Sequence, residues 1–198
     1  HGVDYAPVEV SGYLQGFTRW DAAHFLRISK YGYNEDRDYA FFPLLPMLIK
    51  YGGMGVATVF EISADESLVI SGVLLSNLAF VGAAVVMAKY LSHQYSVSEE
   101  IKQTALLFFC YNPASVFFSG IYTESLFSLL SFPAIASVPL ASNSVGSVLA
   151  ITSCFVRSNG FLNAFFPGFR FIRSLFRAGI SREYSGNMIR SVLWDISI

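Results

Sequence analysis

The chain has 198 residues, of which 54% are hydrophobic, 16% are aromatic and only 14% are charged, and its mean hydropathy is +0.49. A soluble domain usually carries about a quarter of charged residues, so this composition favours an all-α, polytopic membrane protein. The same numbers exclude a disordered chain, and a net charge of −1 without a basic stripe excludes a nucleic-acid-binding protein. Two cysteines are too few for a disulfide framework, and since Cys110 and Cys154 lie in apolar runs they are expected to be small buried hydrophobes.

Charged residues are distributed unevenly along the chain. Residues 1–67 hold nine acids and five bases, residues 104–156 hold only Glu124, and residues 157–198 hold six arginines and two acids. The chain therefore has a polar head, an apolar middle and a basic tail. Because it begins at His1 and no apolar signal-like stretch opens it, we interpret the sequence as an internal piece of a longer protein.

Two short helical elements are predicted in the polar head. Residues 20–31 repeat their apolar positions with helical periodicity, and Gly32 is a typical helix end. Residues 39–50 are rich in aromatic and aliphatic side chains but contain Pro43 and Pro46, which should break the element. This second element is predicted to lie in the headgroup plane or to re-enter the membrane.

The first membrane span is predicted over residues 68–88, which contain 21 positions without a charge. A helix of this length crosses a hydrocarbon core of roughly 30 Å. Lys89 and Tyr90 can anchor its end at the interface. Gly72 and Ser76, four positions apart, form a stripe of small residues that permits close helix packing.

After this span we predict a polar loop over residues 92–103 and then three interrupted apolar runs. Kinked or broken helices are expected in these runs, because prolines or polar residues interrupt each of them. If residues 1–67 are lumenal, four spans would return the basic tail to the lumen, against the rule that positive charges stay on the cytosolic side. A fifth element over 160–176 that turns back would remove this conflict, and we predict it. The runs are 104–122, 126–140 and 144–166, interrupted by Asn112-Pro113, by Pro133 and Pro139, and by residues 157–160.

Asp21 opens the first predicted helix, where an acid can simply complement the positive end of the helix dipole. His24 follows three residues later on the same face, so the alternative is a carboxylate–imidazole pair beside the membrane. A carboxylate in that position could accept a proton from a hydroxyl nucleophile. The residues by themselves leave both interpretations open.

Glu124 is the only charged residue in a block of 53 positions. An acid at membrane depth is costly and by default marks a functional or cavity-facing site. Alternatively, Glu124 begins a helix at the membrane surface, where Thr123 and Ser125 complete a hydrated turn. These two interpretations also remain open.

Arg157 is the first positive charge after Lys102 and follows an apolar run. It could extend to the interface as a membrane anchor. The alternative is an anion pocket suited to phosphate, made by its guanidinium with the Ser158 hydroxyl, the Asn159 amide and the Gly160 backbone N–H. The density of hydrogen-bond donors favours the pocket.

No metal-binding motif of paired cysteines or histidines occurs in the sequence, and we predict no metal and no cofactor. Asp36-Arg37-Asp38 resembles the Asp-x-Asp pattern of metal-dependent sugar transferases. Three charged residues in a loop are, however, more typical of a solvated turn.

Three stretches together resemble the PIG-V family of mannosyltransferases, which add the second mannose in glycosylphosphatidylinositol (GPI) anchor synthesis. Each stretch alone is a weak signal, whereas their order and spacing over about residues 15–165 are specific. They are residues 19–25, with Arg19-Trp20-Asp21, running on to 40–46; residues 112–118, with Asn112-Pro113, through 122–127; and residues 156–160, with Arg157-Ser158-Asn159-Gly160.

This resemblance implies a GT-C glycosyltransferase, a multi-pass endoplasmic reticulum membrane protein whose active site faces the lumen. It would transfer mannose from dolichyl-phosphate-mannose, with inversion and in α1,6 linkage, to the first mannose of the GPI precursor, and a small membrane subunit could be its partner. Residues 1–67 would form a lumenal loop with interfacial helices, 68–176 the transmembrane helical bundle, and 177–198 a polar tail. The residues implied are Asp21 as general base with His24 beside it, and Trp20, Tyr122, Glu124, Arg157, Ser158 and Asn159 for substrate binding, with Arg157 on the donor phosphate.

The sequence also departs from the family pattern. Family members are more than twice as long, with one span before the Trp-Asp motif and several after Arg157-Ser158-Asn159-Gly160, and the tail from Arg170 resembles nothing in them. Two other functions therefore remain open. One is a transporter or channel fragment in which Glu124 and Arg157 line a pathway, and the other is a catalytically inactive structural subunit.

Overall fold

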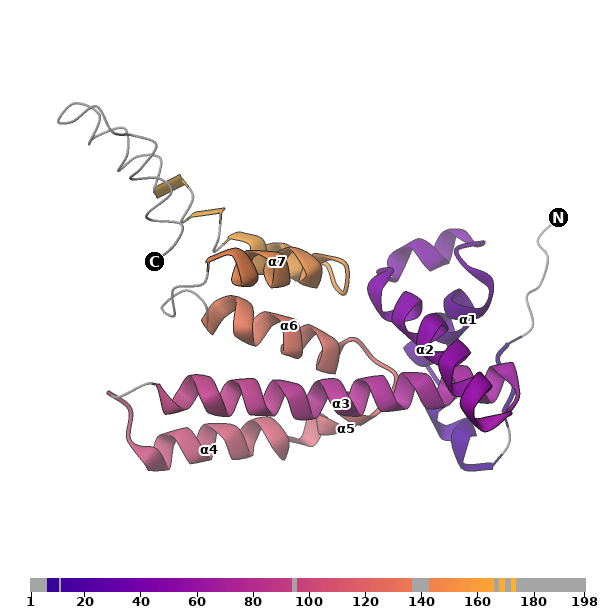
Figure 1. The fold of residues 1–198 in the computed structure, drawn as a ribbon, viewed down its shortest axis with the longest axis horizontal. Helices are drawn as coiled ribbons and strands as arrows, with labels where there is room; N and C mark the ends of the chain where they lie inside the picture. The colour runs from indigo at the N-terminus through magenta and orange to yellow at the C-terminus, as the bar shows by residue number, and fades with distance from the viewer. Residues whose placement is uncertain are drawn as a thin grey trace. The chain divides into compact units, whose positions relative to one another are not determined.

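The computed structural model describes residues 7–10, 12–93, 96–136, 143–165, 168, 169, 172 and 173. These residues are helical or irregular and include no β-strand, so the predicted all-α class is confirmed for the described part of the chain (Figure 1). The chain divides into two compact units, His1–Leu129 and Leu130–Ile198. The predicted tail over 177–198 lies outside the described residues.

The head of the first unit consists of two short 3-10 helices and two α-helices. α1 begins and ends as predicted, with Asp21 in its first turn and Gly32 after its last, where φ of +84° suits glycine. Apolar side chains from one face of α1 pack with those of α2 into a core, and each large one contributes about 1.5–3 kcal/mol by leaving water. The elements are η1 Gly12–Thr18, α1 Asp21–Tyr31, η2 Asp36–Ala40 and α2 Leu44–Phe60, and the core residues are Phe25, Leu26, Ile28, Leu45 and Ile49.

The break predicted around Pro43 and Pro46 is wrong. Pro43 is the residue before α2, and Pro46 lies in its first turn, where no backbone N–H is needed for an intrahelical hydrogen bond. The helix therefore continues for 17 residues to Phe60. Large apolar side chains on α2 are exposed, and their position in the headgroup plane stays a prediction; they are Met47, Leu48, Tyr51, Met54, Val59 and Phe60.

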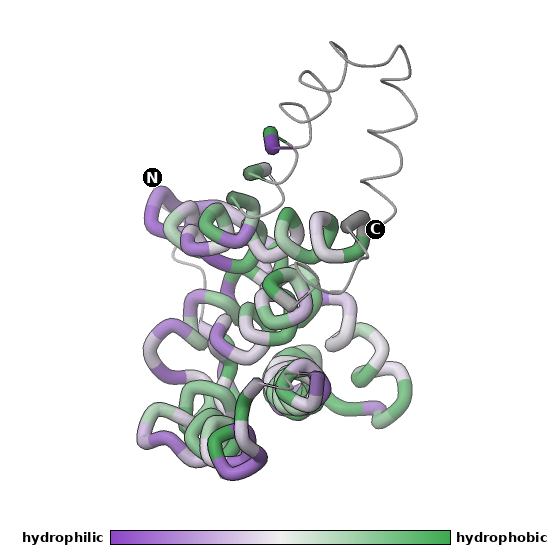
Figure 2. Tube along the Cα trace, turned by 90° about the vertical axis from the view of Figure 1, so that its left-hand side faces the viewer, coloured by the Kyte–Doolittle hydropathy of each residue, from purple (hydrophilic) through white to green (hydrophobic). Residues whose placement is uncertain are grey.

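The third α-helix, α3 (Ala64–Ser92), contains the predicted span and is long and apolar enough to cross a membrane, the one such helix among the described residues. Figure 2 looks nearly along this helix and shows hydrophobic residues around most of it. Its 29 residues extend about 43 Å, more than two turns beyond a hydrocarbon core of roughly 30 Å. Its exposed apolar side chains, suited to lipid, include Leu74, Leu78, Val81 and Val85.

The first turns of α3 are embedded in the head rather than free. Ser63 caps the helix by accepting a hydrogen bond from the Glu66 N–H at 3.2 Å. The Asp65 carboxylate pairs with Lys30 of α1 at 2.6 Å and accepts the Glu9 N–H at 3.0 Å. The hydrogen bond to Asp65 raises the pKa of Lys30 above its ordinary value, so the lysine stays charged and the pair persists at neutral pH. This end of α3 therefore fixes α1.

The predicted stripe of small residues on α3 is confirmed as a packing surface. Gly72 and Ser76 are buried, as are Ala79 and Ala83 one and two turns further on. A Cβ at Gly72 would lie 2.9 Å from the Ile121 Cδ1 atom, so a larger residue would displace Ile121. The stripe thus holds the segment that precedes α6.

The predicted loop over 92–103 is wrong in its second half, because α4 (Glu99–Cys110) begins inside it. Glu99 and Glu100 lie in the first turn, where acids complement the helix dipole, and Lys102 pairs with Glu99 at 2.6 Å. α4 runs back alongside α3 (Figure 1). The two thiols, Cys110 at its end and Cys154 in the second unit, are only half-buried.

The interruption predicted at Asn112-Pro113 is confirmed. α4 ends before it, and only a 3-10 turn, η3 (Pro113–Ser115), and one helical turn, α5 (Val116–Ser119), follow. Residues 104–122 therefore do not form one continuous helix. The rings of Phe80, Phe109 and Phe118, with centroids 5.0–5.5 Å apart, close this region against α3.

Two further helices follow, α6 (Glu124–Ala136) and α7 (Asn143–Cys154). Pro133 lies inside α6. The break predicted at residues 157–160 is confirmed, since α7 ends at Cys154 and helical backbone resumes over 160–165. Pro139 and much of the predicted fifth element lie outside the described residues, and the multi-span topology stays a prediction.

Candidate functional site

Trp20 and Asp21 stand at the start of α1 on an unusual backbone. Trp20 has φ of +55° and ψ of −132°, a conformation that bulky L-residues rarely adopt. Such strain persists only where the surroundings impose it, and it gathers at functional sites. Trp20 is 76% exposed, and the exposed Asp21 carboxylate makes no hydrogen bond or ion pair with a described residue. It is therefore open to an incoming hydroxyl group.

Tyr122 lies within electrostatic reach of Asp21, although a hundred residues separate them. Burial raises the pKa of the Tyr122 hydroxyl, and the negative charges of Asp21 and then Glu124 raise it further. Tyr122 therefore stays neutral at physiological pH and can donate a hydrogen bond. The first unit thus places Asp21 and Glu124 within electrostatic reach of Tyr122.

The Tyr122 ring is fixed by its own loop. It meets Phe117 edge to face at a centroid distance of 5.2 Å and an angle of 89°. Gly120 leaves room for the ring, because a Cβ atom at this position would lie only 2.9 Å from the Tyr122 ring atoms. The Ser125 hydroxyl closes the loop by donating a 2.7 Å hydrogen bond to the Phe118 carbonyl.

The same loop is attached to α3. Ile121 is fully buried against Gly72, and the Asn77 amide donates a hydrogen bond to the Ser119 carbonyl at 3.1 Å. Because α3 also holds α1 through Asp65, one helix positions both Asp21 and Tyr122.

Glu124 is the first residue of α6 and is partly buried. This is the helix start that one interpretation predicts, with the carboxylate at the positive end of the dipole. Its charge also acts on Tyr122, and a functional role of Glu124 stays a prediction.

His24 does not pair with Asp21 in the structure. Its ring stacks on Phe41, with centroids 4.7 Å apart and planes at 17°, and its Nδ1 atom is buried without a hydrogen-bond partner among the described residues. The catalytic assignment of His24 stays a prediction, but a direct carboxylate–imidazole contact is not the arrangement seen.

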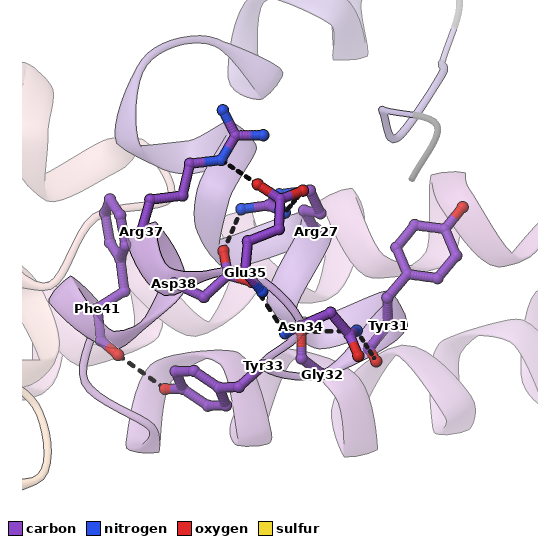
Figure 3. Close-up of polar contacts among 9 residues, drawn as sticks. All are labelled: Arg27, Tyr31, Gly32, Tyr33, Asn34, Glu35, Arg37, Asp38 and Phe41. Carbon is purple, nitrogen blue, oxygen red and sulfur yellow. Dashed lines mark hydrogen bonds and ion pairs between the residues drawn. The ribbon is translucent and has the colours of Figure 1, made fainter. Parts of the chain in front are cut away.

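A buried ion-pair network lies behind α1 (Figure 3). The Arg27 guanidinium contacts both Asp38 and Glu35, and Glu35 also pairs with Arg37. Asp38 is fully buried and accepts the backbone N–H groups of Asn34 at 3.1 Å and Glu35 at 3.0 Å. The solvated turn predicted for residues 36–38 is therefore wrong at Asp38.

This network was missed because its partners are 11 residues apart in sequence. The signal that could have found it is the alternation of charge at residues 36–38 close to an arginine on a predicted helix. The described residues contain no group of three or more His, Cys, Asp or Glu side chains that could hold a metal ion.

The Arg157 turn belongs to the second unit. The Gly160 N–H donates to the Arg157 carbonyl at 2.9 Å, so it is not free for an anion, and this part of the predicted pocket is wrong. Ser158 and Asn159 have exposed side chains, while their carbonyls accept the N–H groups of Phe161 and Leu162. The Ser158 and Asn159 side chains are thus presented outward on a hydrogen-bonded backbone, whereas Arg157 is half-buried.

Two residues hold this turn in place. A Cβ at Gly160 would overlap the Ser153 carbonyl, so only glycine fits there. The buried Asn163 amide donates hydrogen bonds to the hydroxyls of Ser131 at 2.7 Å and Ser153 at 3.0 Å. Sequence reasoning missed Asn163, whose only signal is a polar residue in an apolar stretch.

Comparison with known proteins gives a consistent result. Residues 5–194 match the family model described as Mannosyltransferase (PIG-V). GPI alpha-1,6-mannosyltransferase 2 of Mus musculus is 32% identical over 154 residues, which cover 78% of this chain and 31% of that protein. The Homo sapiens protein of the same name is 34% identical over 158 residues, covering 79% and 32%. GPI mannosyltransferase 2 of Drosophila pseudoobscura pseudoobscura is 31% identical over 159 residues, covering 78% and 35%.

The chain thus spans about a third of the length of these relatives. No solved structure matches it significantly.

Proposed function

Because the chain belongs to the PIG-V mannosyltransferase family, we propose that it carries the catalytic head of an enzyme of the endoplasmic reticulum membrane. The enzyme transfers mannose from dolichyl-phosphate-mannose to the first mannose of a GPI precursor, in α1,6 linkage. The observation that carries this proposal is the exposed Asp21 carboxylate, which pairs with no described residue and whose charge acts on the neutral Tyr122 hydroxyl. The names of the mouse and human relatives, GPI alpha-1,6-mannosyltransferase 2, support a GPI substrate and the α1,6 linkage.

In the proposed reaction, Asp21 accepts the proton of the acceptor hydroxyl while its oxygen attacks the anomeric carbon of the donor mannose. The bond from that carbon to the phosphate oxygen breaks, and dolichyl phosphate leaves with the electron pair. A single displacement inverts the anomeric carbon. Tyr122 donates a hydrogen bond that orients the acceptor, with Glu124 beside it, and the exposed Trp20 indole contacts a sugar face.

We assign the donor phosphate to Arg157, with Ser158 and Asn159 as additional hydrogen-bond donors. The fixed backbone of the turn supports this assignment, because it holds the exposed Ser158 and Asn159 side chains next to Arg157 in sequence. A guanidinium binds phosphate in a bidentate manner, which a lysine ammonium cannot reproduce.

Arg157→Lys is expected to raise the KM for dolichyl-phosphate-mannose by about 10-fold or more, since the charge remains but the paired hydrogen bonds are lost. Initial rates of mannose transfer in microsomes at varied donor concentration give this value. Arg173→Lys, an exposed arginine outside the turn, is the matched control. Wild-type donor kinetics in Arg157→Lys would make Arg157 a membrane anchor instead.

The proposed function itself is tested in cells that lack the second GPI mannosyltransferase. The whole encoded protein is expressed in these cells. Microsomes prepared from them are then incubated with labelled dolichyl-phosphate-mannose and the singly mannosylated GPI precursor. We expect a doubly mannosylated product. Transport of a lipid or sugar without transfer would favour a transporter, and expression without transfer or transport would favour a structural subunit.

The proposed topology places residues 1–67 in the lumen and residues 92–103 in the cytosol, on either side of α3. Tyr13→Cys and Ser96→Cys, both at exposed positions, report the two sides when the two half-buried native thiols are changed to serine. In sealed microsomes a membrane-impermeant maleimide should label Ser96→Cys only, and Tyr13→Cys only after permeabilisation. Labelling of Tyr13→Cys in sealed vesicles would reverse the assignment.

A further inference from the structure

The head of the first unit contains a cavity that the proposed mechanism does not use. Its volume is about 610 Å³, within the range of small-molecule sites in proteins. Residues 7–10, η1 and α1 form its walls, together with Arg37 of η2. Ala23 and His24 of α1 line it, so the cavity begins within one helical turn of Asp21.

Three arginines line this cavity, and they are not equivalent. Arg27 is buried and bonded to Glu35 and Asp38, so it is part of the wall. Arg37 uses its Nε atom on Glu35, and its two terminal nitrogens point away from that carboxylate (Figure 3). Arg19 is exposed and makes no ion pair with any described residue. Two guanidinium groups therefore retain donors for a ligand.

The remaining polar lining suits hydroxyl groups. The buried His24 Nδ1 atom lacks a hydrogen-bond partner among the described residues, and Glu9 and Gln15 also line the cavity. Carboxylate and amide groups bind sugar hydroxyls, whereas free guanidinium donors bind phosphate in a bidentate manner.

We propose that this cavity binds a phosphorylated sugar headgroup, with the phosphate on Arg19 and Arg37 and the sugar hydroxyls on Glu9 and Gln15. The inference rests on the proposed function for the identity of the lipid that carries this headgroup. Two sources share the chemistry, the phosphorylated glycan of the acceptor lipid and the mannosyl phosphate of the donor lipid. The acceptor is compatible with the assignment of the donor phosphate to Arg157, whereas binding of the donor here would replace that assignment. His24 lines the cavity one helical turn from Asp21, so a headgroup bound there lies close to the start of α1.

Binding to the purified protein in detergent tests the site without any transfer activity. Titration calorimetry with mannose 1-phosphate, inorganic phosphate and mannose should show saturable binding of the two phosphates and much weaker binding of mannose. Arg19→Gln should weaken mannose 1-phosphate binding by about 10-fold or more, and Arg19→Lys by less, because one charge-assisted bond of the pair is retained. Lys50→Gln, an exposed cation outside the cavity, is the matched control and should bind normally. Unchanged binding in Arg19→Gln, or no phosphate-dependent binding by the wild type, would overturn the proposal.

Transfer kinetics then distinguish the two sources. A higher KM of Arg19→Gln for the GPI precursor alone assigns the cavity to the acceptor, and a higher KM for dolichyl-phosphate-mannose alone assigns it to the donor. Unchanged KM values for both lipids would overturn the link to this reaction. If the wild type transfers no mannose, the proposed function fails. The cavity would still be supported as a phosphate-binding site if Arg19→Gln loses phosphate binding.

Discussion

Replacing Asp21 with asparagine is expected to lower mannose transfer by about 10²–10⁴-fold, the usual contribution of a general base. This corresponds to roughly 3–5 kcal/mol in the activation barrier. Asparagine keeps the size of the side chain and much of its hydrogen bonding, but it cannot take a proton from the acceptor hydroxyl. Restoration of surface GPI anchors in the deficient cells, together with the microsomal rate, measures the loss.

The folded protein should tolerate this substitution. Asp21 is exposed, bonded to no described residue, and contributes only about 0.3–1 kcal/mol through the helix dipole. Asp36→Asn, at an exposed acid in the same head, is the control and should keep wild-type transfer. If Asp21→Asn restores surface GPI anchors to the wild-type level at the same protein abundance, Asp21 is not the general base. If the variant protein does not accumulate, Asp21 has a structural role.

Features set by local sequence could be predicted. The α1 helix followed from its apolar periodicity and from Gly32, and α3 from a long uncharged run. The break at Asn112-Pro113 followed from proline chemistry. In each case the residues that decide the structure are neighbours in the chain, so a single sequence contains the whole cause.

Features set by distant contacts could not be predicted. Asp38 looked like part of a solvated turn because nothing near it in sequence shows that Arg27 will bury its carboxylate. Pro46 looked like a helix breaker because its effect depends on whether it falls in the first turn. The site shows the same limit, since the charge of Asp21 acts on Tyr122, a residue far away in sequence, and α3 holds both segments.

The buried ion pair between Arg27 and Asp38 gives the largest expected effect on stability. Asp38→Asn removes the negative charge and leaves Arg27, which is 8% exposed, with only the partly exposed Glu35 as a partner. Breaking a buried pair by removing one partner costs about 3–5 kcal/mol, because the remaining charge is desolvated and uncompensated. Chemical denaturation of the detergent-solubilised protein should show a loss at the lower end of this range, since Glu35 remains.

Two further variants separate the lost pair from a general effect of substitution. Glu35→Gln should cost less than Asp38→Asn, because Glu35 is more exposed and Asp38 would still neutralise Arg27. Combining Asp38→Asn with Arg27→Met should recover part of the stability, since no unpaired charge is then buried. A double variant as unstable as the sum of its single variants would show that the two residues act independently. The buried pair would then not be the cause of the lost stability.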